Sequence, residues 1–172
     1  MFQSLVNTVG NTPLVKLNII PGSENFKKNN IILGKLEGNN PAGSVKDRAA
    51  VSMILGAKKR GYIKSGDVLI EATSGNTGIA LAMAAKMMGF KMRLIMPENL
   101  SVERRQVMKA FGADLVLVSQ REGMEGARDL AKSMEDEGDG FVLDQFSNDD
   151  NWLAHYSGTG KEILSATNHQ VS

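Results

Sequence analysis

The clearest candidate for a binding site is a small polar turn near the middle of the chain. Thr73-Ser74-Gly75-Asn76-Thr77-Gly78 stands between the apolar run Val68-Leu69-Ile70 and an apolar helix predicted from Ile79 to Met88. That order places backbone N–H groups, hydroxyls and the positive end of a helix dipole at the carboxyl edge of a parallel sheet. The turn predicts an anion site, although a tight turn that binds nothing has the same pattern.

Lys46 is the second candidate. Ser44, which follows Pro41-Ala42-Gly43, is expected to cap a helix that runs through Val45 to about Arg60. Lys46 then falls in the first helical turn, where the dipole disfavours a cation. The residues around it are apolar, namely Ala49, Ala50, Val51 and Met53. Such surroundings favour the neutral amine that a Schiff base needs, whereas a solvated surface position is the commoner explanation of a single lysine.

Other chemistry is poorly supported. Gly75-Asn76-Thr77-Gly78 lacks the G-x-G-x-x-G spacing of dinucleotide sites. Gly158-Thr159-Gly160-Lys161 resembles a P-loop, but Glu162 stands where Ser or Thr must hold magnesium. The chain has no cysteine, and its two histidines, His155 and His169, have no partner ligand nearby in the sequence. We therefore expect neither a nucleotide site nor a metal site.

Strand and helix patterns alternate four times from Asp67 onward. This alternation predicts a doubly wound α/β fold, in which helices cover both faces of a parallel sheet. Two further strands, expected at 12–17 and 31–36, lie outside this repeat and should pair elsewhere. The four strands are expected at 68–70, 92–96, 115–118 and 141–143, and the helices that follow them at 79–88, 101–111, 123–135 and 152–164.

Composition narrows the class of protein further. The chain has 172 residues, 42% of them hydrophobic, and 20 basic residues balance 19 acidic ones. This balance argues against a nucleic-acid wrapper or a polybasic membrane binder. The apolar segment from Ile79 to Phe90 is too short to cross a bilayer, which needs about 20 residues. We expect a cytoplasmic globular protein with small-molecule substrates and with neither nucleic acid nor membrane as a partner.

Three motifs together closely resemble the cysteine synthase (O-acetylserine sulfhydrylase) family of fold type II pyridoxal-phosphate enzymes. They are Asn11-Thr12-Pro13-Leu14-Val15, Asn40-Pro41-Ala42-Gly43-Ser44-Val45-Lys46-Asp47-Arg48 and the turn Thr73 to Gly78. Leu36-Glu37-Gly38-Asn39 and the segment Met124 to Asp129 most resemble the bacterial B-isozyme type, which also accepts thiosulfate. The similarity runs from about Leu5 to Ile163.

The resemblance implies a role for each matching residue. Lys46 would hold pyridoxal 5'-phosphate through its amine and would later remove the α-proton of the substrate. Asn76 would hydrogen-bond the ring oxygen of the cofactor. The implied reaction replaces the acetate of O-acetyl-L-serine by sulfide or thiosulfate, in a homodimeric enzyme of cysteine biosynthesis. The substrate carboxylate would be bound by Thr73, Ser74, Gly75, Thr77 and Gln145.

The resemblance also implies how the chain is divided. Residues 1–11 and 40–150 would form an essentially complete smaller domain, and 12–39 and 151–172 the opening pieces of a larger cofactor-binding domain. The family's phosphate-gripping loop does not occur before Ser172, so we expect a chain truncated at its C-terminus, with exposed sheet edges and weak cofactor retention. Two alternatives stay open: an impaired fragment that acts as a binding or regulatory module, and another fold type II lyase such as cystathionine β-synthase.

Overall fold

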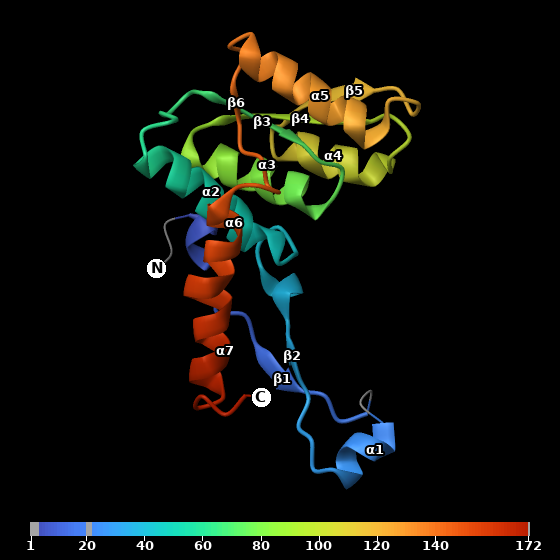
Figure 1. Ribbon diagram of the computed structural model, residues 1–172, viewed down its shortest axis with the longest axis vertical. Coiled ribbons are helices and arrows are strands. Elements are labelled where there is room, and N and C mark those ends of the chain that lie inside the picture. Colours follow the sequence, from blue (N-terminus) through green and yellow to red (C-terminus); the bar gives the residue numbers. More distant parts are fainter. Residues whose placement is uncertain (1–3, 20–21, 172) are drawn as a thin grey trace.

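The computed structural model describes residues 4–19 and 22–171. They form an α/β unit joined to a narrower extension that ends near α1 and the C-terminus (Figure 1). The α/β unit contains a four-stranded sheet, and the extension contains a separate two-stranded sheet. Within the part of the chain described, no helix is long and apolar enough to cross a membrane.

The four-stranded sheet confirms the predicted doubly wound α/β architecture. Its strand order is β5-β4-β3-β6, and every neighbouring pair is parallel. Parallel neighbours require crossover connections, and the predicted helices supply them. The observed strands coincide with the predicted ones to within two residues, and they are β3 (Val68–Ala72), β4 (Lys91–Pro97), β5 (Asp114–Val118) and β6 (Phe141–Val142).

Helices cover both faces of this sheet (Figure 1). Leu69 packs into a core cluster with residues of α2 and α3, whereas its neighbour Ile70 packs with Ala127 and Ala131 of α5. Successive side chains of a strand point to opposite faces, so a continuous apolar run serves both cores. The helices are α2 (Lys46–Lys59), α3 (Asn76–Met88), α4 (Val102–Ala110) and α5 (Gly123–Asp136).

Two glycines allow helices to approach closely at this core. A Cβ placed on Gly78 would lie 2.8 Å from Cε of Met108 and 3.1 Å from Cγ2 of Thr73. A Cβ on Gly56 would overlap the carboxylate of Asp150, which lets the helix carrying Asp150 lie directly against α2. Glycine at these positions therefore sets how tightly α2 and α3 pack against their neighbours.

The extension is built from the two strands outside the repeat. β1 (Leu14–Lys16) pairs antiparallel with β2 (Leu33–Lys35), next to a short helix, α1 (Gly22–Lys27), that the sequence pattern did not predict. Two 3-10 helices, η1 (Leu5–Thr8) and η2 (Glu37–Asn39), link this part to the α/β unit. A cavity of about 530 Å³ lies between β1, β2 and the C-terminal segment. Apolar residues at this edge are exposed, as expected: Ile31 by 67%, Leu33 by 38% and Val171 by 50%.

The last helix differs from the prediction of one helix over 152–164. The structure has α6 (Asp149–Ala154), a π-helical turn η3 (His155–Thr159) and α7 (Gly160–Ala166). The helix begins earlier because the Asn148 side chain accepts a hydrogen bond from the backbone N–H of Asp150 at 3.0 Å. The P-loop-like segment 158–161 is helical, so it does not form a phosphate-binding loop.

The two predicted helix caps had different outcomes. Ser101 caps α4 as expected, since its hydroxyl accepts from the backbone N–H of Arg104 at 3.3 Å. The cap expected at Ser44 was wrong by one residue, because Val45 is the N-cap and has no side-chain oxygen. Ser44 Oγ instead accepts from the backbone N–H of Lys46 at 3.1 Å. Lys46 is nevertheless the first residue of α2, in the first turn as predicted.

Candidate active site

The predicted anion-binding turn lies between β3 and α3. Gly75 is the N-cap of α3 and is in extended conformation, with no side-chain cap on the helix. Because no side chain caps the helix, the positive end of the α3 dipole stays available for an anion. Thr73 and Thr77 are buried, Ser74 is half-buried and Asn76 is exposed.

Gly75 leaves open space in front of this turn. A Cβ added at Gly75 would meet nothing within 4 Å. The backbone N–H of Thr73 donates to Ile95 O on β4 at 3.1 Å, which ties the start of the turn to the sheet. The turn thus combines a fixed backbone with an unobstructed approach, which suits the carboxylate of a small ligand.

The turn before α2 is held by Asp47. One carboxylate oxygen of Asp47 accepts from the backbone N–H of Ala42 at 2.6 Å. The other oxygen is buried and has no hydrogen-bond partner among the described residues. Burial raises the pKa of the Asp47 carboxyl above its ordinary value. This contact fixes the backbone from which the Lys46 side chain projects.

Lys46 is half-buried, and its amine has no hydrogen-bond or ion-pair partner within the ranges 4–19 and 22–171. Three of the four apolar residues predicted near it, Ala49, Ala50 and Met53, are each at most 1% exposed, whereas Val51 is half-buried. An amine in such a place is free to react with a carbonyl, as a cofactor aldehyde requires. The residues present therefore fit pyridoxal phosphate at the Lys46 end of the site.

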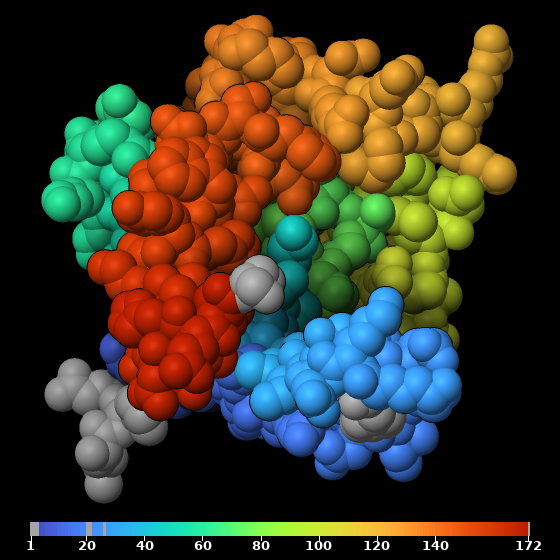
Figure 2. All heavy atoms as spheres, turned by 60° about the horizontal axis from the view of Figure 1, so that its bottom comes forward, coloured from blue at the N-terminus to red at the C-terminus, as the bar shows by residue number. Residues whose placement is uncertain are grey.

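The start of α2 and the Thr73 to Thr77 turn lie on the same side of the molecule. α2 packs along α3. In Figure 2, the teal segment at the start of α2 and the green segment of the β3–α3 turn lie in a recess. The recess is bordered by the red C-terminal helix, the blue extension and the yellow-green part of the α/β unit. The start of α2 and the β3–α3 turn thus border the same hollow.

Gln145 follows β6 and is attached to β3. Its backbone N–H and its side-chain Nε2 donate to Glu71 Oε1 at 3.5 and 3.3 Å. Its carbonyl oxygen accepts from Asn151 Nδ2 at 2.6 Å. Because Glu71 lies two residues before Thr73, these contacts place Gln145 beside the β3–α3 turn.

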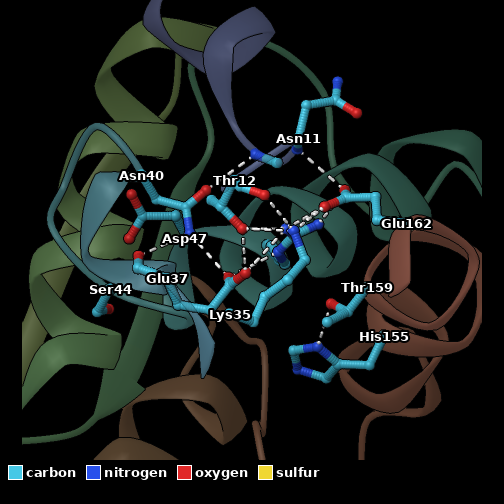
Figure 3. Close-up of polar contacts among 12 residues, drawn as sticks. Asn11, Thr12, Lys35, Glu37, Asn40, Ser44, Asp47, His155, Thr159 and Glu162 are labelled. Atoms are coloured by element: carbon cyan, nitrogen blue, oxygen red, sulfur yellow. Dashed lines mark hydrogen bonds and ion pairs between the residues drawn. The ribbon is translucent and has the colours of Figure 1, made fainter. Parts of the chain in front are cut away.

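A buried ionic network, which the sequence pattern did not predict, connects α2 to the extension (Figure 3). Arg48 donates from Nε to Glu37 Oε2 at 2.7 Å and from Nη1 to Glu162 Oε1 at 2.6 Å. Lys35 donates to Glu162 Oε2 at 2.7 Å. Arg48 keeps the pKa of Glu162 below its ordinary range, and hydrogen bonds from Arg48, Thr12 and Asn40 lower that of Glu37 to about 2 despite burial.

His155 is the histidine nearest to this network, in the π-helical turn (Figure 3). Its Nδ1 lies 3.0 Å from Thr159 Oγ1. Burial, followed by the charges of Lys46 and Arg48, lowers the pKa of His155 below its ordinary value. The described residues contain no group of side chains arranged to hold a metal ion.

Comparisons with known proteins identify the class to which this fold and site belong. Residues 5–172 match the family model described as pyridoxal-phosphate dependent enzyme, and the chain belongs to this family. Within it, the chain is 60% identical over 170 residues to cysteine synthase B of Salmonella typhimurium, covering 99% of this chain and 55% of that protein. It is also 60% identical over 166 residues to cysteine synthase B of Pseudomonas syringae pv. syringae, covering 96% of each.

Solved structures agree with this assignment. Cysteine synthase from Entamoeba histolytica superposes with a TM-score of 0.93 at 42% identity, covering 99% of this chain and 51% of that one. The chain thus spans about half the length of most curated relatives and structures that it matches. The resemblance to the cysteine synthase family, drawn from three motifs, is confirmed, and so is the resemblance to its B-isozyme type, drawn from two further segments.

Proposed function

We propose that the protein carrying this chain is a cysteine synthase, which replaces the acetate of O-acetyl-L-serine by sulfide or thiosulfate and uses pyridoxal 5'-phosphate. One observation carries the proposal. Lys46, whose amine has no partner among the described residues, begins α2, and α2 packs along α3, whose start has no side-chain cap. An amine and an anion site in one hollow are what an amino-acid substrate and an aldehyde cofactor require.

Each side chain then has a task in this reaction. When bound, pyridoxal phosphate supplies an electron sink for the substrate's α-carbon. Lys46 holds the cofactor and, once displaced by the substrate's amine, takes the α-proton. Asn76 donates its side-chain amide to the ring oxygen of the cofactor.

The substrate's carboxylate is bound by the turn that follows β3. Backbone N–H groups at the start of α3 and the hydroxyls around Gly75 donate to it, and Gln145 donates from its side-chain amide. These contacts orient the substrate so that its α-proton faces Lys46. The residues assigned to the carboxylate are Thr73, Ser74, Gly75, Thr77 and Gln145.

The domain division, the cellular location and the oligomeric state are proposed in the same way. We infer a cytoplasmic homodimer in which 1–11 and 40–150 belong to a smaller domain and 12–39 and 151–172 to a larger one. The separate β1–β2 sheet supports this division, although residues 1–3 lie outside the described ranges. The exposed apolar edge at Ile31 and Leu33 is consistent with a larger domain that continues there.

Product analysis tests the proposed function. The protein that carries this chain is incubated with excess pyridoxal phosphate and O-acetyl-L-serine, with sulfide or thiosulfate, and acetate release and the sulfur-containing amino acid are measured. We expect both products, and we expect Lys46→Ala to reduce their formation by about 10²–10⁴-fold. Lys59→Ala, at the exposed far end of α2, is the matched control and should behave like the unsubstituted chain. Equal rates in Lys46→Ala and Lys59→Ala would contradict the proposal.

A further inference from the structure

Glu71 is a buried carboxyl group to which the proposed reaction gives no task. It is 3% exposed, near the end of β3, and stands opposite Leu94 of β4. Its Oε1 accepts both hydrogen bonds from Gln145, and its Oε2 is buried with no partner among the described residues. A buried carboxyl group that is only half satisfied is costly, so its retention here calls for a reason.

The loop that carries Gln145 is held on several sides. Asp144, just before Gln145, has a φ of +50°, a left-handed conformation that costs energy in a residue other than glycine. Asn151 donates to the carbonyl of Gln145, and Asn148 donates to the carbonyl of Leu143 at 2.7 Å. A strained backbone persists only where its surroundings determine it, and the contacts to Glu71 complete that restraint.

We propose that Glu71 is a positioning residue, which holds the side-chain amide of Gln145 at the site for the substrate's carboxylate. This inference rests on the proposed function, because it assigns that site to Gln145. A side-chain amide has two N–H donors. One points to Glu71 Oε1, which leaves the second for a carboxylate in the hollow. Without Glu71 the amide could rotate, and the substrate would have to order it on binding.

The charge on Glu71 affects this arrangement. Burial raises the pKa of Glu71 to about 7, with a further contribution from the negative charge of Asp144. On α5, Arg128 and Lys132 line a cavity of about 240 Å³ with Glu71, and on β4 Arg93 is paired with Asp114. Neutral Glu71 holds the amide without repelling a carboxylate on its other side, whereas ionised Glu71 places two negative charges on either side of one amide.

The test compares Glu71→Leu with Glu71→Gln in the full chain with pyridoxal phosphate bound. Leucine removes the acceptor, and we expect KM for O-acetyl-L-serine to rise about tenfold with kcat little changed, since one lost hydrogen bond is worth about a decade in affinity. Glutamine keeps an acceptor and cannot ionise. We therefore expect a low KM in Glu71→Gln that no longer rises above about pH 7, unlike that of the unsubstituted chain. Glu125→Gln on the exposed side of α5 is the matched control.

A second readout is independent of turnover. The NMR signals of the Gln145 backbone and side-chain amides should shift with pH in the unsubstituted chain without substrate, and should stay constant in Glu71→Gln. Constant signals in the unsubstituted chain, or an unchanged KM in Glu71→Leu, would overturn the inference. If Glu71→Leu does not fold, the pH series of Glu71→Gln decides. If no turnover is found at all, the proposed function fails while the amide signals still decide the role of Glu71.

Discussion

The guanidinium of Arg48 donates to Glu162 Oε1 at 2.6 Å and joins the first turn of α2 to α7, 114 residues later in the chain. Arg48 is two residues after Lys46, so this ion pair helps to fix the helix start that carries the candidate catalytic amine. The Arg48 side chain is 5% exposed and that of Glu162 is 18% exposed. Both charges are largely removed from water, and Glu37 and Lys35 complete the network of opposite charges around them.

Breaking this pair should destabilise the fold. In Glu162→Gln, Arg48 and Lys35 lose their shared carboxylate, and we expect the free energy of unfolding to fall by about 3 kcal/mol because buried charge is left uncompensated. Urea denaturation measures the change. Glu24→Gln is the control, because its pair with Lys27 is fully on the surface and should contribute less than about 1 kcal/mol. Equal losses in both variants would show that the Arg48 pair is not buried in solution.

Acid should weaken the same network. The pKa of Glu37 is about 2 in the folded chain against an ordinary value of 4.5, so the unfolded chain binds more protons between these values. The stabilisation from Glu37 is therefore complete above about pH 4.5 and is lost as the pH falls towards 2. Urea midpoints measured across this range should drop less steeply in Glu37→Gln than in the unsubstituted chain. If the urea midpoints of Glu37→Gln and of the unsubstituted chain fell equally with pH, the lowered pKa of Glu37 would be contradicted.

Glu71 should have the opposite effect on stability. Its pKa is raised from 4.5 to about 7 in the folded chain, so the folded state holds the proton longer than the unfolded state. Stability should fall as the pH rises from about 4.5 to about 7 and then level off. Glu71→Gln removes this loss and should be more stable than the unsubstituted chain above pH 7, by up to about 3 kcal/mol. Thermal unfolding at pH 5 and pH 8 measures the difference, and a Glu71→Gln chain less stable at both pH values would contradict it.

Substitutions of two glycines in the β3–α3 turn should affect stability and substrate binding separately. In Gly78→Ala the new methyl group meets Met108 and Thr73, and we expect a loss of about 1–3 kcal/mol in stability from overpacking. In Gly75→Ala the methyl group enters open space in a backbone conformation that alanine adopts readily, so stability should change by less than about 1 kcal/mol. KM for O-acetyl-L-serine should nevertheless rise in Gly75→Ala, because the methyl group faces the substrate. An unchanged KM there would place the substrate elsewhere.

The sequence was sufficient to predict those structural elements that depend on residues close together in the chain. Apolar runs, the polar segment at Thr73 to Thr77 and the serine at position 101 predicted the sheet, the turn between β3 and α3 and one helix start, because each depends on neighbouring residues. The ionic network was missed since Arg48, Glu37 and Glu162 are far apart in the chain and each alone looks like a surface charge. Asn148, four residues before the predicted helix start at residue 152, was a cap signal that could have been recognised.

Glu71 shows why the rest of the site could not be predicted. A single acidic residue at the end of an apolar strand indicates a strand end as readily as a buried carboxyl group. Only the packing of β6 beside β3 places Gln145 against it and removes it from water. The roles of Lys46, Asn76, Thr73, Ser74, Gly75, Thr77 and Gln145 stay predictions, which the variants above test.

The central claim is that Lys46 forms the covalent bond to pyridoxal phosphate, and one measurement tests it directly. The full chain is incubated with the cofactor, the bond between lysine and cofactor is reduced with borohydride, and the modified peptide is identified by mass spectrometry. The account predicts that the cofactor is attached to Lys46, that Lys59→Ala is labelled equally and that Lys46→Ala is not labelled. A cofactor attached to another lysine, or labelling that persists in Lys46→Ala, would contradict the account.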